Sequence, residues 1–314
     1  PLPHALPPLP AGVSPALISH VVLQALGWLG RLVLVDLGCP VAPAVPHLRL
    51  PAPEGGSTAA CLSSGRAMAP ERVRALLARG QRWGRSPSTR APLLLAECVP
   101  GGTSTALAVL QGLGIAATGL VGGSLREPAH GLKDRLARQG LQAAGLTTAP
   151  PPAAGAAAAH GLAVLAAVGD PMQALAAGVC LGLAERELPL LLAGGSQMAA
   201  VLALALALAP PGLRPAIARN TVVATTAWVL NDANNDLRAL LGAIGQRWGV
   251  RPQLQVAGLH FDGCREAALR DYERGYVKEG VGAGGLAWLW EQSGRSPAQL
   301  ASACDRACSQ LLAT

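Results

Sequence analysis

The segment Leu93–Leu113, LLLAECVPGGTSTALAVLQGL, contains the pattern that decides the fold. It begins with the apolar run Leu93–Ala96, passes through a turn that contains Pro100, Gly101 and Gly102, and ends in an apolar stretch of helical length. A buried strand, a glycine turn and a helix in this order make up the first half of a βαβ unit, from which parallel sheets are built. The segment therefore predicts an α/β fold.

Apolar runs of strand length recur along the chain, and most of them precede a turn cluster and a helical pattern. Because strands that alternate with helices form parallel units with right-handed crossovers, we expect a doubly wound, mostly parallel, Rossmann-like sheet. The other expected strands are Leu32–Gly38, Ala117–Val121, Leu162–Val168, Leu188–Leu192, Ile217–Ala224 and Leu254–Leu259. The expected helices cover residues 106–113 or end near Arg186, Leu208 and Trp248.

The two ends of the chain lie outside this alternation. We expect residues 1–90 and 270–314 to form a small helical lobe, and residues 91–269 to form a large nucleotide-binding domain. Pro297–Leu312 is predicted as a helix, because proline is favourable at the first helical position and Ser296 suits the N-cap.

The composition narrows the class of protein. Hydrophobic residues make up 51% of the chain and charged residues 14%, so enough apolar surface is available to exclude a disordered chain. Charge-free runs such as Leu188–Leu213 are long enough to span a bilayer, but glycine and hydroxyl clusters interrupt them. We therefore expect a buried sheet in a cytoplasmic protein that does not enter a membrane, with an integral membrane protein as the alternative. No signal peptide is expected, and residues before Pro1 are expected to be missing.

Charge, cysteines and histidines exclude several further classes. The net charge is +7, but the basic residues are scattered, so nucleic acid is not an expected partner. The seven cysteines form no CxxC pair, which favours free thiols in a reduced compartment. The six histidines are isolated, so we expect no metal site and no hydrolase triad. No cofactor is expected either.

Polar and glycine-rich clusters follow the ends of several predicted strands. In open α/β sheets the ligand crevice lies at the carboxyl ends of the strands, so we expect these clusters to meet there. Free N–H groups at the helix starts, together with hydroxyls, suit an anion, although capped helices after tight turns are the alternative. Besides Glu97, the residues expected at this crevice are Gly101, Gly102, Thr103, Ser104, Thr105, Gly194, Gly195, Ser196 and Gln197.

The stretch Tyr272–Gly285, YERGYVKEGVGAGG, contains the second candidate carboxylate, Glu279. A carboxylate on a glycine-rich turn can face a pocket with little steric hindrance and can act as a general base. We expect Lys278, Gly280 and Gly282 to contribute to substrate binding beside it. The alternative is the entry to a helix with an exposed Lys-Glu pair.

Five segments carry a resemblance to a known family: AECVPGGTSTALAVLQGLG, HGLKDRL, AVGDPMQALAAGV, LLLAGGSQMAAVLAL and YERGYVKEGVGAGG. They resemble a family found in archaea and cyanobacteria that is similar to nicotinate-nucleotide–dimethylbenzimidazole phosphoribosyltransferase. The resemblance implies a homodimeric α/β protein with a helical lobe from both chain ends. It also implies that Glu279, in the pattern Glu-Gly-x-Gly-Ala, is the catalytic glutamate, and that Glu97 is a second active-site glutamate.

The resemblance implies a transfer of the phosphoribosyl group of nicotinate mononucleotide to an aromatic base similar to dimethylbenzimidazole, in the synthesis of the lower ligand of cobalamin. The main alternative is a protein of the same fold that binds a nucleotide or a base without catalysis. A dinucleotide oxidoreductase is disfavoured, because no Gly-x-Gly-x-x-Gly follows the first strand.

Overall fold

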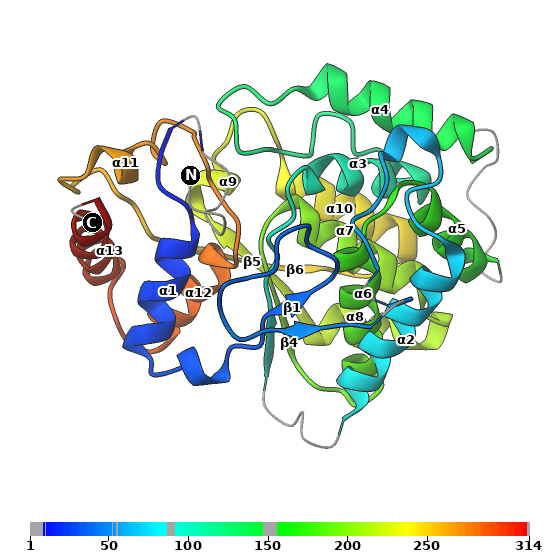
Figure 1. The fold of residues 1–314 in the computed structure, drawn as a ribbon, viewed down its shortest axis with the longest axis horizontal. Coiled ribbons are helices and arrows are strands. Elements are labelled where there is room, and N and C mark those ends of the chain that lie inside the picture. The colour runs from blue at the N-terminus through cyan, green and yellow to red at the C-terminus, as the bar shows by residue number, and fades with distance from the viewer. Residues whose placement is uncertain are drawn as a thin grey trace.

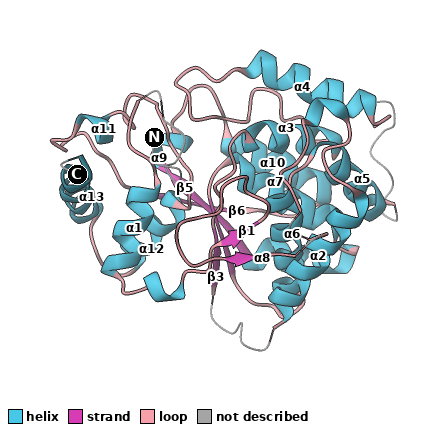
Figure 2. Cartoon of the chain, viewed as in Figure 1, coloured by secondary structure: helices cyan, strands magenta, loops and turns pink. Residues whose placement is uncertain are grey.

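The computed structural model describes residues 9, 11–51, 53–54, 56–86, 92–146 and 156–312. Its centre is a four-stranded sheet with the order β3-β4-β5-β6, in which each neighbouring pair of strands is parallel. The strands are β3 (Leu93–Leu95), β4 (Leu190–Ala193), β5 (Thr221–Thr226) and β6 (Gln253–Ala257). This confirms the expected parallel α/β fold, and Figure 2 shows the sheet between two groups of helices.

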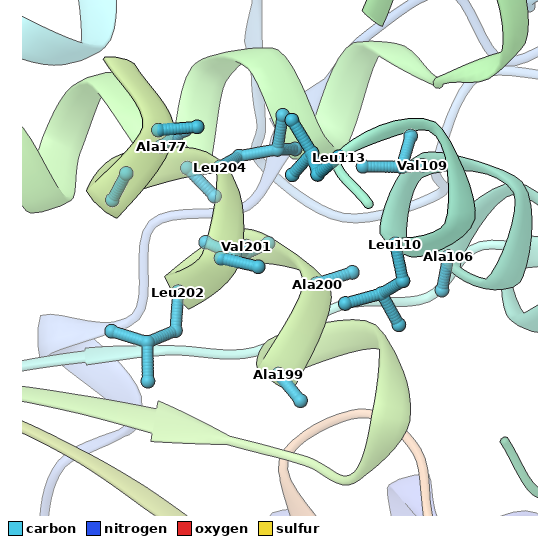
Figure 3. Close-up of a cluster of buried hydrophobic side chains, with 14 of the residues drawn as sticks. Ala106, Val109, Leu110, Leu113, Ala177, Ala199, Ala200, Val201, Leu202 and Leu204 are labelled. Carbon is cyan, nitrogen blue, oxygen red and sulfur yellow. The ribbon is translucent and has the colours of Figure 1, made fainter. Parts of the chain in front are cut away.

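The larger group of helices contains the main hydrophobic core. The strands are adjacent in chain order, so right-handed crossovers place their connecting helices on one face of the sheet. The helices there include α3 (Gly102–Gly112), α6 (Pro171–Ala184), α7 (Ser196–Leu208) and α10 (Leu237–Trp248) (Figure 1). Helix α7 contacts the other three, and every residue of it from Met198 to Ala207 is buried. Figure 3 shows its side chains beside those of α3 and α6.

A further helix, α2 (Pro70–Arg85), crosses α6 with almost no space between the two backbones. Gly80 of α2 and Gly178 of α6 lie at this crossing. A Cβ atom at Gly178 would lie 2.2 Å from the carbonyl oxygen of Leu77, and one at Gly80 would lie 2.1 Å from that of Leu175. Only glycine permits this approach, because it has no Cβ.

The second group of helices contains α1 (Ala16–Ala25), α11 (Ala267–Arg270), α12 (Ala283–Gln292) and α13 (Pro297–Leu312) (Figure 1). These helices share a second hydrophobic core, and α12 contacts β4, β5 and β6, so the sheet has helices on both faces. The small helical lobe built from both chain ends is thus confirmed, but α2, which lies within the expected range 1–90, packs against α6 in the larger group instead. Helix α13 has the predicted bounds, and Ser296 Oγ accepts a hydrogen bond from the backbone N–H of Gln299 at 3.2 Å.

Two of the expected strands are wrong, and a third is wrong in part. Leu162–Val168 lies in helix α5 (Ala157–Val168), and Ala117–Val121 is irregular. Ile217–Ala224 begins in helix α8 (Arg214–Asn220), and only its later residues belong to β5. A short apolar run cannot by itself distinguish a buried strand from a buried helix, and the alanine-rich sequence of α5 favours a helix.

The early strand expected within Leu32–Gly38 is present as β1 (Val35–Asp36), which pairs in parallel with β2 (Leu48–Arg49) in a separate small sheet. The domain boundaries at residues 91 and 270 stay a prediction. The remaining elements are η1 (Leu29–Arg31), η2 (Leu62–Ser64), α4 (His130–Ala143), η3 (Pro211–Leu213) and α9 (Ala227–Leu230). Across the described ranges, no helix has both the length and the apolar character needed to cross a membrane.

Candidate active site

Glu279 lies beside the carboxyl end of β5, in the loop that leads into α12. Its Oε2 accepts hydrogen bonds from Thr225 Oγ1 at 2.9 Å and from the backbone N–H of Thr226 at 3.1 Å. Its Oε1 accepts from the backbone N–H groups of Gly280 and Gly284, both at 3.0 Å. Four donors therefore fill the roughly four acceptor positions of a carboxylate. Among them, only the hydroxyl of Thr225 can rotate away and free an acceptor position for a proton.

The loop around Glu279 has a strained backbone. Val277, Lys278 and Val281 have φ angles of 65°, 64° and 52°, in the left-handed region that residues with a Cβ rarely occupy. Such conformations cost about 1–3 kcal/mol each and are found mainly where the surroundings enforce them, often at functional sites. Here the hydroxyl of Thr226 donates to the carbonyl of Lys278 at 2.6 Å, and the N–H of Val281 donates to the carbonyl of Glu97 at 2.9 Å.

Gly284 explains part of the glycine-rich sequence after Glu279. A Cβ atom at this position would lie 2.4 Å from Glu279 Oε2 and 2.3 Å from the backbone carbon of Thr225. The first turn of α12 can therefore approach the carboxylate and donate its N–H only because residue 284 is glycine. Gly280 and Gly282 have positive φ angles of 142° and 79°, which suit glycine for a different reason.

Glu97 follows β3 and occupies the same edge of the sheet. Its Oε2 accepts a hydrogen bond from the backbone N–H of Val99 at 2.8 Å, and the side chain of Gln197 lies near enough to favour the charged form of the carboxyl. Burial raises the pKa of Glu97 to about 7, against the hydrogen bond from Val99, and the charges of Asp170 and Glu279 add to the rise. The two glutamates predicted from the sequence thus lie close enough to interact.

This raised pKa makes a prediction about stability. Between pH 4.5 and 7 the folded chain holds a proton on Glu97 that the unfolded chain has lost, so the contribution of Glu97 to stability decreases as the pH rises through this window. We expect the wild type to lose up to about 3 kcal/mol more than the variant Glu97→Gln between pH 4.5 and 7.5. Urea unfolding at both pH values measures the difference, and parallel losses in the two proteins would contradict the prediction.

The predicted turn Gly101–Thr105 forms the start of α3, with Gly101 in the left-handed region at a φ of 75°. Thr105 Oγ1 donates a hydrogen bond to Asp170 Oδ2 at 2.6 Å. Asp170 is buried and also caps α6, because its Oδ1 accepts from the backbone N–H of Gln173 at 3.0 Å. Asp170 thereby ties the start of α3 to the start of α6, and burial raises the pKa of its own carboxyl.

The second predicted turn, Gly194–Gln197, lies at the start of α7, between the two glutamates and a loop that follows α3. Ser196 Oγ accepts a hydrogen bond from the N–H of Gly122 at 3.3 Å. The carbonyl of Gly122 in turn accepts one from the Nζ of Lys133 on α4. Lys133 is only 7% exposed, and burial and the charge of Lys278 lower its pKa to about 8. No carboxylate among the described residues forms an ion pair with it.

Lys133 and the salt-bridge partner of Lys278 were not predicted from the sequence. The alternative of an exposed Lys278-Glu279 pair is wrong, because the side chain of Lys278 is only 3% exposed and its Nζ lies 2.6 Å from Asp232 Oδ2. Burial alone would raise the pKa of Asp232, but the hydrogen bonds from Lys278 and Asn234 outweigh it and lower the pKa. Lys133 belongs to HGLKDRL, one of the segments that carry the family resemblance, but the sequence does not indicate that this lysine is buried, because its burial depends on tertiary structure.

Within the part of the chain that the structure describes, one group of potential metal ligands lies in the lobe, at the carboxyl end of β6. His260, Asp262 and Glu273 each place a ligand atom within 4.8 Å of the others. His260 Nδ1 lies 3.3 Å from Glu273 Oε2, and the backbone N–H of Phe261 donates to the other oxygen of Glu273. A hydrogen-bonded pair between two loops accounts for these contacts.

A parallel sheet with glycine turns at helix starts and two interacting glutamates at strand ends is typical of an α/β protein that binds a phosphate-containing small molecule. The comparison with known families is more specific. Residues 30–220 match the DBI_PRT family, described as phosphoribosyltransferase, and the chain belongs to this family. The resemblance noted in the sequence is thereby confirmed.

Cyanobacterial proteins of the UPF0284 group are similar over almost the whole chain. One from Parasynechococcus marenigrum (strain WH8102) is 49% identical, covering 98% of this chain and 75% of the relative. Another from Prochlorococcus marinus (strain MIT 9313) is 48% identical, covering 99% and 75%.

Among solved structures, nicotinate-nucleotide-dimethylbenzimidazole phosphoribosyltransferase from Thermus thermophilus has a similar fold. The TM-score is 0.54 at 21% identity, over 96% of this chain and 76% of that one. CobT from the same organism matches with a TM-score of 0.53 at 22% identity, over 93% of this chain and 76% of that one.

Proposed function

We propose that this protein transfers the 5-phosphoribosyl group of nicotinate mononucleotide to an aromatic base, in the synthesis of the lower ligand of cobalamin. The single observation that carries this proposal is the position of Glu279, whose carboxylate lies at the carboxyl end of β5 and interacts electrostatically with Glu97 beyond β3. Family membership and the fold of the Thermus enzymes support it. We also propose that the protein is cytoplasmic and that it forms a homodimer. Sedimentation in solution would test the homodimer.

The reaction needs little from the protein beyond positioning and one base. The bond between C1′ of the ribose and the pyridinium nitrogen breaks, and its electron pair neutralises that nitrogen, so nicotinate leaves without being protonated. The unprotonated ring nitrogen of the acceptor forms the new bond to C1′, and the N–H proton on the other ring nitrogen passes to Glu279, so that the product ring is neutral. The hydroxyl of Thr225 turns away from Oε2 as the proton arrives. A positioned base contributes about 10²–10⁴-fold to such a step, and orientation of the two rings contributes further.

The phosphate in this proposal binds at the starts of α3 and α7. Both helices are longer than ten residues and direct free N–H groups to the carboxyl edge of the sheet. Lys133, which is buried beside Gly122 and forms no ion pair with a carboxylate of the described residues, supplies the positive charge that a buried phosphate requires.

The variant Lys133→Met should therefore raise the KM for nicotinate mononucleotide about 10–100-fold with a smaller change in kcat, because a charged hydrogen bond to phosphate is worth about 1.5–3 kcal/mol. Initial rates at varied nucleotide concentration measure both constants. Arg138→Met, on the exposed side of α4, is the control. An unchanged KM would show that the phosphate binds elsewhere.

The experiment that tests the function is incubation of the protein with nicotinate mononucleotide and benzimidazole, purine or phenol acceptors. Release of nicotinate together with the α-ribotide supports the proposal. Binding of the nucleotide without release of nicotinate, with every acceptor, would favour the alternative of a non-catalytic binding protein on the same fold.

A further inference from the structure

The buried ion pair between Lys278 and Asp232 lies directly beside Glu279, and nothing in the proposed reaction accounts for it. The Nζ of Lys278 donates to Asp232 Oδ2 at 2.6 Å and to the carbonyl of Leu125 at 3.2 Å. The two side chains are 3% and 6% exposed. Burying two opposite charges is costly and rarely adds net stability, so a pair in this position calls for another explanation.

The partners of Asp232 make it a fixed anchor. The backbone N–H of Asn234 donates to Oδ1 at 3.0 Å, and Asn235 Nδ2 donates to Oδ2 at 2.6 Å. Asp232 belongs to the loop between α9 and α10, and Leu125 belongs to the loop after α3. Lys278 therefore joins two separate loops to the segment that carries Glu279.

The segment that Lys278 holds is the strained one. Val277, Lys278 and Val281 all have left-handed backbone angles, which relax unless neighbouring contacts maintain them. The carbonyl of Lys278 accepts from the hydroxyl of Thr226, whose own N–H donates to Glu279. Displacement of Lys278 would thus disturb both the backbone and one donor of the carboxylate.

We propose that Lys278 is a positioning residue, and that its ion pair with Asp232 holds Glu279 against Thr225 and Thr226 in the orientation needed for proton transfer. Lys278 then contributes no contact to the substrate phosphate, because Asp232 already neutralises its charge. This inference refines the proposed function and depends on it for its catalytic consequence. The placement of the loop depends only on the contacts described above.

The first test does not require any activity. Hydrogen exchange of residues 277–285 reports the backbone N–H groups of Gly280 and Gly284, which donate to Glu279. We expect faster exchange in Lys278→Met and in Asp232→Asn than in the wild type. The control Arg219→Met, which removes a cation from an exposed ion pair with Glu187, should leave this segment unchanged. Wild-type exchange in both pair variants would overturn the proposal.

The second test separates positioning from substrate binding. If Lys278 positions Glu279, both Lys278→Met and Asp232→Asn lower kcat, by up to about 10²-fold for a displacement of about 1 Å, with little change in the KM for nicotinate mononucleotide. If Lys278 binds the phosphate instead, only Lys278→Met raises that KM, and Asp232→Asn frees the lysine and lowers it. The second pattern would overturn the proposal.

The pH profile excludes a purely structural role. The titratable groups that interact with Glu279 are Glu97 after β3 and Tyr272 after α11, and Lys278 adjoins it. Burial raises the pKa of Glu279, and the hydrogen bonds from Gly284, Gly280, Thr225 and Thr226 oppose that rise. Loss of either member of the ion pair should loosen these donors, so Lys278→Met and Asp232→Asn should both raise this pKa and move the acid limb of kcat to higher pH. An unchanged acid limb in both variants would contradict the proposal.

A failure of this proposal can be distinguished from a failure of the proposed function. If the wild type releases no nicotinate with any acceptor, the proposed reaction is wrong, and hydrogen exchange still decides whether the ion pair holds the Glu279 loop. If the wild type is active and Lys278→Met keeps the wild-type kcat and acid limb, the reaction stands and the positioning role is wrong.

Discussion

Replacing Glu279 with glutamine should lower kcat for phosphoribosyl transfer about 10²–10⁴-fold, which is the usual contribution of a general base. Glutamine keeps the size of the side chain but removes the negative charge that accepts the proton of the acceptor N–H. The effect should appear in kcat rather than in the KM for nicotinate mononucleotide, because the phosphate contacts of the proposed site lie on α3, α7 and Lys133. Single-turnover release of nicotinate measures it.

Two controls make this result interpretable. In Glu279→Gln an NH₂ group replaces one accepting oxygen, so it faces the backbone N–H groups either of Gly280 and Gly284 or of Thr226. Two donors that face each other repel, so the loop itself can shift. Glu279→Asp, which retains the charge, shows whether the charge or the geometry matters. Glu71→Gln, at an exposed position at the start of α2, makes the same change of charge outside the loops that carry the carboxylates and should retain activity. A wild-type rate in Glu279→Gln would remove this residue from the mechanism.

The position of Glu97 could be predicted because it follows from local pattern and from one rule of topology. Glu97 directly follows an apolar run and precedes a glycine turn, and parallel strands bring such ends to one edge of the sheet. The partner of Lys278 could not be predicted in this way. Asp232 lies 46 residues away, and the charge pattern around Lys278 is the same whether the side chain is buried or in water.

The fold, like the candidate site, could be predicted from the sequence only in part. The strand Leu93–Leu95 is bounded by proline and a glycine turn, so its sequence indicates it directly. Leu162–Val168 is equally apolar, but it lies in a helix that packs against α7 and α2. The spacing of apolar residues does not distinguish this strand from this helix, since both segments are buried on most sides.

The low charge of the chain also has a structural explanation. Helices α6 and α7 are buried around almost their whole circumference, so they contain no charged residue and do not show the one-sided pattern of a surface helix. Layers of helices on both sides of the sheet produce this composition. The apolar runs that resemble membrane spans in the sequence are the centre of the main core.

The crossing of α2 and α6 should be sensitive to any added side-chain atom, because the two backbones are in direct contact there. Gly178→Ala should lower the free energy of unfolding by about 1–3 kcal/mol or more, although alanine is favoured over glycine in a helix by about 1 kcal/mol. The added Cβ would lie 2.2 Å from the carbonyl oxygen of Leu77, and a rigid backbone group can give way only if the helices separate. Urea or thermal unfolding measures the loss.

Gly242 provides the matched control, because it lies inside helix α10 and a Cβ there would meet no atom within 4 Å. Gly242→Ala should therefore raise the free energy of unfolding by about 0.5–1 kcal/mol, the opposite sign for the same substitution. A larger residue such as valine at position 178 should cost more than alanine, since it must displace the backbone of α2 further. If both alanine variants were stabilised, the two helices would have to lie further apart than the positions of Gly80 and Gly178 indicate.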